Sequence, residues 1–152
     1  MEFKSLNPST TVARIGDFEK DFGISFPSCY RNFLLDHNGG RPMNSIFPIK
    51  NFMDSFGGIQ VFFGLDTPVT TSDLTWQVKN RIVRFPKVLL EIACTGTGDL
   101  VCIDTNTELA PVYFFNSRPS WRNGIWRDQD LYLIAPSFSE FLSLLCCSSF
   151  AS

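Results

Sequence analysis

Two stretches near the start of the chain repeat apolar residues at helical spacing. The first places its apolar side chains on one helical face, at Val12, Ile15, Phe18 and Phe22. We expect this helix to begin at Asn7-Pro8, because asparagine caps helices well and proline fits the first helical position. Gly23 should end it. A second helix is predicted after Phe26-Pro27, with its apolar side chains at Tyr30, Phe33 and Leu34.

The second helix should end at Asn38-Gly39-Gly40, because a glycine just past the last turn readily adopts the left-handed conformation that closes a helix. The chain therefore opens with a helical hairpin.

The middle of the chain changes to short runs of β-branched and aromatic residues. Each run is bounded by Gly, Pro, Asn or Asp, which is typical of strands, and the runs cover residues 59–63, 88–93, 100–104, 112–115 and 131–135. Most gaps between the last four runs are too short for crossover helices, so antiparallel neighbours are expected. Residues 95–98 and 105–107 are the predicted hairpin turns, and residues 72–81 are predicted to form a short helix carrying Leu74 and Val78.

The last segment has a strong helix-start signal. Ser137 and Glu140 have the spacing of a capping box. An apolar stripe follows at Phe138, Phe141, Leu142 and Leu145. The pattern predicts an α+β fold with an N-terminal helical hairpin, a central, mainly antiparallel sheet and a closing C-terminal helix. We expect one domain spanning residues 1–152.

Composition supports a folded, water-soluble chain and narrows its partners. Hydrophobic residues make up 44% of the 152 residues, and the net charge of −2 is spread without a Lys/Arg stripe, so direct nucleic-acid binding is not expected. No membrane-length apolar run and no signal-peptide pattern in residues 1–16 are present, so neither a membrane partner nor secretion is expected. The five cysteines are an odd number and lie mostly in apolar stretches, as reduced thiols of a cytoplasmic protein do.

Candidate chemistry is sparse. The single histidine, His37, lies two turns from Cys29 on the predicted second helix, and side chains that far apart on one helix do not meet. Cys146 and Cys147 are adjacent and point to different helix faces, so they cannot chelate a metal together. We therefore expect no catalytic residues, no metal and no cofactor.

Two further features are poor candidates for catalysis or phosphate binding. Asp99 and Asp104 lie at opposite ends of one predicted strand and on opposite faces, which disfavours paired-carboxylate catalysis. The run Gly96-Thr97-Gly98 matches no phosphate-binding pattern and is best explained as a hairpin turn.

The longest irregular stretch, residues 116–129, concentrates the residue types that dominate protein interfaces. It holds two of the three tryptophans of the chain together with several arginines. The candidate partner-binding residues are Asn116, Arg118, Trp121, Arg122, Trp126 and Arg127. If this interpretation holds, Trp121 and Trp126 contribute to affinity more than to stability. The alternative is that both indoles fold back as lids over the sheet.

Several segments together resemble the SUKH superfamily, which contains bacterial immunity proteins and fungal cell-wall-assembly regulators. The similarity runs from about residue 15 to residue 145 and rests on ordered short motifs. These include Phe26-Pro27-x-x-Tyr30-x-x-Phe33-Leu34, Asn38-Gly39-Gly40-x-Pro42, Gly98-Asp99-Leu100-Val101-Cys102-Ile103-Asp104 and Ser137-Phe138-x-Glu140-Phe141-Leu142. The positions that match family motifs and could matter most are Glu19, Pro27, Asn38, Gly39, Gly40, Gly98, Asp99 and Asp104.

The resemblance implies the same α+β architecture and a role in binding protein. The resemblance first implies that the chain is an immunity-type protein. Such a protein neutralises a cognate toxin domain, for example a nuclease or a deaminase, by direct stoichiometric binding. An alternative is a scaffold or regulatory domain of the cell-wall-assembly regulator type. A third reading, from the residues themselves, is a small-ligand binder or enzyme that uses Cys29 or His37.

Overall fold

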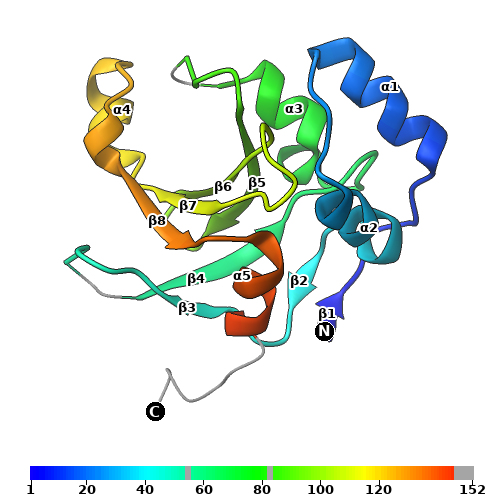
Figure 1. Cartoon of the computed structure of the whole chain (residues 1–152), viewed down its shortest axis with the longest axis horizontal. Coiled ribbons are helices and arrows are strands. Elements are labelled where there is room, and N and C mark those ends of the chain that lie inside the picture. The colour runs from blue at the N-terminus through cyan, green and yellow to red at the C-terminus, as the bar shows by residue number, and fades with distance from the viewer. Residues whose placement is uncertain (54–55, 82–83, 146–152) are drawn as a thin grey trace.

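The fold combines a six-stranded antiparallel sheet with several short helices (Figure 1). The computed structural model describes residues 1–53, 56–81 and 84–145, and of residues 121–123 the backbone alone. The helices are α1 (Val12–Phe22), α2 (Ser28–His37), α3 (Leu74–Lys79), α4 (Arg118–Asn123) and α5 (Phe138–Leu145), with short 3-10 turns η1 (Thr70–Ser72) and η2 (Asp128–Asp130). The strands are β1 (Phe3–Ser5), β2 (Arg41–Pro42), β3 (Ile46–Pro48), β4 (Phe56–Phe62), β5 (Leu89–Thr95), β6 (Leu100–Asp104), β7 (Val112–Phe115) and β8 (Leu131–Ala135).

The main sheet is an antiparallel meander in the order β3-β4-β5-β6-β7-β8, and a separate two-stranded sheet pairs β1 with β2. This confirms the α+β class and the antiparallel pairing. The predicted bounds of β6, β7 and β8 are those observed. The strands β1, β2 and β3 were not predicted, because runs of two or three residues carry no readable alternation.

Helix α5 nearly closes the sheet by packing against both of its edge strands, β3 and β8. The Phe141 ring lies 5.6 Å from the Phe47 ring of β3. At the start of the helix, the backbone N–H of Glu140 donates to Ser137 Oγ at 3.1 Å, which is the serine half of the predicted capping box. The C-terminal helix therefore contacts both edge strands of the sheet and buries apolar side chains against them.

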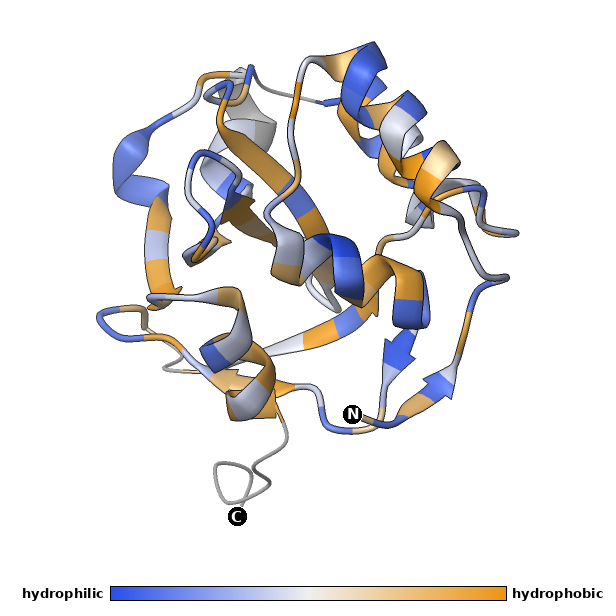
Figure 2. Ribbon diagram, turned by 45° about the vertical axis from the view of Figure 1, so that its right-hand side comes forward, coloured by the Kyte–Doolittle hydropathy of each residue, from blue (hydrophilic) through white to orange (hydrophobic). Residues whose placement is uncertain are grey.

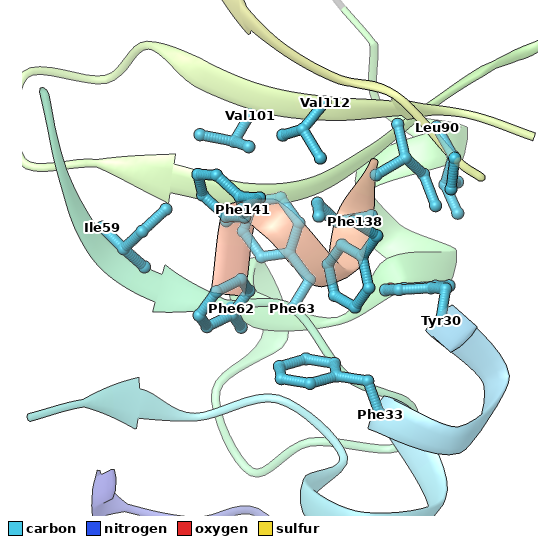
Figure 3. Packing of buried hydrophobic residues seen from close by; sticks show 14 of the residues in the cluster. Tyr30, Phe33, Ile59, Phe62, Phe63, Leu90, Val101, Val112, Phe138 and Phe141 are labelled. Carbon is cyan, nitrogen blue, oxygen red and sulfur yellow. The ribbon is translucent and has the colours of Figure 1, made fainter. Parts of the chain in front are cut away.

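The main core fills the space between this curved sheet, α5 and the N-terminal hairpin (Figure 3). Phe33 of α2 lies with its ring centroid 5.0 Å from that of Phe62 and 5.3 Å from that of Phe138. Tyr30, one turn earlier, meets the same Phe138 ring at 5.5 Å. Edge-to-face aromatic packing of this kind lets residues from three distant parts of the chain fix one another's position.

The first helix begins later than expected. α1 starts at Val12 with Thr11 as its N-cap, whose side chain accepts from the Arg14 N–H, so the predicted start at Asn7-Pro8 was wrong. The Asn7 side chain is instead used elsewhere, donating to the carbonyl of Asn38 at 2.9 Å. The predicted end at Gly23 is confirmed, with φ at 64°. Figure 2 shows hydrophilic and hydrophobic residues alternating along α1, as expected of a helix with one buried side.

Residues 116–129 are not the irregular stretch that was predicted. They contain α4 and most of η2, so this part of the prediction was wrong. The local signals were present in the sequence: Pro119 lies in the first turn of α4, and Gly124 ends the helix with φ at 69°.

A second, smaller apolar cluster covers the other face of the sheet. Its buried members are Phe85, Leu89, Cys102 and Phe115. Leu89, Cys102 and Phe115 alternate along β5, β6 and β7 with residues of the main core, as the two-residue period of a strand requires, and Phe85 lies in the segment before β5. The sheet is therefore apolar on both faces, and the second face also carries a pocket next to α4.

Candidate functional site

The Asn38-Gly39-Gly40 motif is a structural junction. Asn38 is fully buried and left-handed, with φ at 47°, and it rather than a glycine caps α2. Its Nδ2 donates to the carbonyls of Pro8 and Leu65, at 2.7 and 2.9 Å, and its Oδ1 accepts from the Leu65 N–H at 2.9 Å. One side chain thus joins the N-terminal segment, the end of α2 and the chain after β4.

The two glycines of the motif are required by close backbone approach. Gly39 and Gly40 have φ of 79° and 116°, a region that disfavours side chains. A Cβ on Gly39 would lie 2.5 Å from the carbonyl oxygen of Phe62, and one on Gly40 would collide with the carbonyl oxygen of Ser5. Gly40 and Phe62 also exchange two backbone hydrogen bonds, at 3.0 and 2.8 Å.

Glu19 and Pro27 organise the turn between the first two helices. Glu19 Oε2 accepts from the backbone N–H of Phe26 at 2.7 Å and from the Arg31 guanidinium at 2.8 Å. The carbonyl of Pro27 accepts from the N–H groups of Tyr30 and Arg31 in the first turn of α2.

Asp99 links the β5–β6 turn to α4. It is buried, and its Oδ1 accepts from the backbone N–H of Ser117 at 3.1 Å and from Ser117 Oγ at 3.2 Å. Its Oδ2 accepts from Thr97 Oγ1 at 3.0 Å and lies 3.6 Å from the Arg118 guanidinium. Gly98 takes part through its carbonyl, which accepts from Ser117 Oγ at 2.9 Å.

Asp104, at the far end of β6, accepts from the Asn106 N–H at 2.8 Å and so shapes only its own turn. Most of the other matched motif positions, by contrast, connect segments that are far apart in the chain.

Four of the predicted partner-binding residues have described side chains, namely Asn116, Arg118, Trp126 and Arg127. They lie in α4 and in the segments on either side of it, which together form the α4–η2 surface. Trp126 is half-buried and stacks on Phe115, with ring centroids 4.7 Å apart and 9° between the planes. Its Nε1 donates to Asp128 at 2.7 Å. Arg127 is exposed and forms two hydrogen bonds to the buried Asp130, at 3.0 and 2.8 Å.

Asn116 and Arg118 lie at the start of the same surface. The Asn116 N–H donates to the carbonyl of Asp130 at 2.9 Å, and Asn116 Oδ1 is a buried oxygen with no partner in the described part of the chain. The side chains of Trp121 and Arg122 lie outside the described residues, so their predicted role stays a prediction.

A pocket of about 260 Å³ lies beside this surface on the second face of the sheet. Its described walls come from α3 and the segment after it, from strands β5, β6 and β7, and from α4. Figure 1 shows α3 and α4 apart from each other, with β5 and β6 between them. The lining is mainly apolar and includes Trp76, Phe85, Leu100 and Phe115.

The same pocket contains a buried ion pair that the sequence interpretation missed. Arg81 donates to both oxygens of Glu91, at 2.8 and 2.6 Å, and its guanidinium also lies over the Phe85 ring, 4.9 Å from the centroid. The Glu91 side chain is 1% exposed. The signal was readable, because a glutamate inside the apolar run 88–93 needs a cationic partner.

Cys29 and His37, the two candidate catalytic residues, contact different parts of the protein. Cys29 Sγ lies 3.6 Å from the carbonyl of Glu108, and burial raises the pKa of its thiol, the opposite of what an activated nucleophile needs. His37 packs against Phe3, with ring centroids 4.5 Å apart, and burial lowers its pKa. Within the described ranges, no three His, Cys, Asp or Glu side chains are grouped to hold a metal ion.

Comparison with known families gives a match across most of the chain, over residues 9–144. The chain belongs to the SMI1 / KNR4 family (SUKH-1). Membership of the SMI1/KNR4 family confirms the SUKH resemblance and supports a protein-binding role, of the immunity type or of the SMI1/KNR4 type. The family is generally non-catalytic. No curated protein and no solved structure matches the chain significantly. None of the described helices is both long and apolar enough to cross a membrane.

Proposed function

We propose that this SMI1/KNR4-family protein is a cytoplasmic immunity-type protein that neutralises a cognate toxin domain by direct, stoichiometric binding. The proposal rests on the family match over residues 9–144. The matched motif residues, such as Asn38 and Asp99, make hydrogen bonds that stabilise the fold. In this proposal the contacts of Asp99 and Asp130 fix the surface before binding, and a surface ordered in advance binds a partner at a lower entropic cost.

The binding surface in this proposal is the one that α4 and η2 form. At the start of α4, Asp99 accepts a hydrogen bond from the Ser117 N–H. Next to η2, Asp130 accepts one from the Arg127 guanidinium. Trp126 stacks on Phe115 yet remains partly exposed, so it offers a pre-oriented aromatic anchor. Tryptophan and arginine in such settings contribute most of the energy at many interfaces. Asn116, Arg118, Trp121 and Arg122 belong to the same proposed surface.

The proposal implies that a toxin domain is encoded beside this gene, and co-expression of the two proteins tests it. Growth should be rescued at equimolar levels of the two proteins, because occlusion consumes one inhibitor for each toxin. Rescue by trace amounts would instead require turnover, and it would overturn the binding mechanism.

Single substitutions then locate the surface. Trp126→Ala removes the aromatic anchor, and Arg127→Gln removes a charge. We expect each to weaken toxin binding by about 30-fold if it is an interface hot spot worth about 2 kcal/mol. Lys20→Gln, on the exposed side of α1, is the matched charge control and should leave affinity unchanged. Equal affinities for all three variants would place the interface elsewhere on the protein.

The second function that the family supports is a scaffold or regulator that binds other cellular proteins. Genomic neighbourhood separates the two, since an immunity protein is encoded next to its toxin. Affinity capture from the native host followed by mass spectrometry would show whether the retained partner is that toxin.

A further inference from the structure

A second pocket adjoins the first and differs from it in chemistry. It has a volume of about 300 Å³ and lies where β1, β2 and β4 meet η1 and α3. The two pockets share two lining residues, Gln77 of α3 and Cys94 of β5. The two pockets therefore lie next to each other. Together they are called the groove, with one half next to β2 and the other half next to α4.

The half of the groove next to β2 is lined mostly by polar residues, of which Arg41 is cationic. Arg41 lines it together with hydrogen-bonding side chains such as Asn7, Gln60 and Thr71. No aspartate or glutamate stands among its described lining residues. Arg41 is exposed and forms no ion pair with any described carboxylate. Burial raises the pKa of the Cys94 thiol, which lies in the wall that the two pockets share.

The half next to α4 is apolar and electrically balanced. Its one cation, Arg81, is already neutralised by Glu91 through two hydrogen bonds. Trp76, Leu100 and Phe115 supply aromatic and aliphatic surface. A pocket of about 260 Å³ accommodates a large apolar side chain and is too small for a folded element.

We infer that this groove binds an extended peptide segment of the partner, with an apolar side chain in the α4 half and a carboxylate at Arg41. Charge complementarity fixes the carboxylate end, because an unpaired guanidinium without competing acids favours an anion and fits a carboxylate fork. Desolvation of the apolar end supplies most of the affinity. The inference rests on the proposed protein-binding function and adds the chemistry of the epitope.

The carboxylate could come from an acidic side chain or from the C-terminus of a chain, and the probes distinguish the two sources. One probe set is acetyl-Phe-(Gly)-Asp-amide with zero to three glycine spacers. Matched peptides carry Asn in place of Asp or Ala in place of Phe, and a further set ends in a free carboxylate after Phe-Gly. Binding is followed by tryptophan fluorescence and by NMR shifts of the groove residues.

We expect the best spacer to bind with a Kd of about 1 mM, a level typical of short flexible ligands. Replacing Asp by Asn in that peptide should weaken binding about tenfold, the loss expected for one charge-assisted hydrogen bond. Arg41→Gln should abolish the difference between the Asp and Asn peptides. Lys20→Gln removes one charge from a helix that lines neither pocket and should leave the difference intact.

Two further variants test the groove without depending on Arg41. Gln77→Glu adds a carboxylate at the shared wall and should weaken the Asp peptide about tenfold more than the Asn peptide. Leu100→Phe fills the apolar half and should weaken the Phe peptides but not their Ala counterparts. Denaturant midpoints of both variants confirm that the fold is kept.

The two proposals can fail separately. If the toxin is neutralised and its affinity is unchanged by Arg41→Gln, Gln77→Glu and Leu100→Phe, the groove inference is wrong and the function stands. If no toxin rescue occurs but the peptides bind with the expected Asp preference, the groove stands and the immunity function is wrong. Equal binding of Asp and Asn peptides by the unmodified protein overturns the groove inference directly.

Discussion

A methyl group on Gly39 should destabilise this protein far more than one on Gly23, although both glycines follow a helix in the left-handed region. Gly23 has φ of 64° and open space where its Cβ would lie, so Gly23→Ala carries only the conformational cost. That cost is about 1–2 kcal/mol for an L-residue. Gly39 has φ of 79° and carries the same cost plus a collision.

The collision at Gly39 cannot be relieved cheaply. Its Cβ would lie 2.5 Å from the carbonyl oxygen of Phe62 and 2.6 Å from that of Phe63, and both obstacles are backbone atoms. The Phe62 carbonyl is also bonded to the Gly40 N–H at 3.0 Å, so moving it breaks the bridge between these segments. Forcing extra volume into a packed site costs about 1–3 kcal/mol. We therefore expect Gly39→Ala to lower the free energy of unfolding by about 2–5 kcal/mol.

Urea unfolding of the two alanine variants and the unmodified protein measures the difference. The melting temperature should fall by roughly 2–4 °C for each kcal/mol in a chain of this size. Gly40→Ala, whose Cβ meets the Ser5 carbonyl oxygen, should resemble Gly39→Ala. If Gly39→Ala costs no more than Gly23→Ala, close backbone approach is not the reason for the Asn38-Gly39-Gly40 motif.

Three further predictions concern buried polar groups. Tyr30 is fully buried, its hydroxyl has no partner in the described structure, and burial first and Glu91 second raise its pKa. Because the pKa of this hydroxyl is higher in the folded than in the unfolded state, its contribution to stability is kept below about pH 10 and lost above it. The unmodified protein should therefore lose about 1.4 kcal/mol of unfolding free energy relative to Tyr30→Phe by about pH 11, and the variant should show no penalty at pH 7. Parallel curves of unfolding free energy for the two proteins from about pH 8 to 11 would contradict this. Asp99→Ala leaves the Ser117 N–H unsatisfied and should speed amide hydrogen exchange in α4 while β4 stays protected, whereas uniform protection would show that Asp99 does not anchor the helix. Cys102 is buried and burial holds its pKa well above the ordinary value, so iodoacetamide should label it only after unfolding, and labelling of the native protein at the denatured rate would refute its burial.

Local sequence patterns determined most of the secondary structure, because the signals that set it are short in range. Periodicity located α2, α5 and the strands β6 to β8, and the cap at Ser137 marked where α5 begins. The Asn38-Gly39-Gly40 run correctly indicated the end of α2, but the left-handed cap is Asn38 and not a glycine, as the prediction had it. The same kind of signal at Pro119 and Gly124 would have located α4, had it been weighed against the apparent irregularity of the stretch.

What the sequence could not determine are contacts between residues far apart in the chain. Asn7 looked like a helix cap because its local context fits one, yet the buried end of α2, 31 residues away, uses its side chain instead. Glu91 implied a cationic partner, but only the path of the chain after α3 brings Arg81 to it. The groove is likewise a tertiary feature. Arg41, Gln77 and Cys94 lie on β2, α3 and β5, three elements far apart in the chain that only the folded structure brings together. Propensities and caps act within a few residues, whereas a binding site is made where distant segments are packed together, and that packing depends on the whole core.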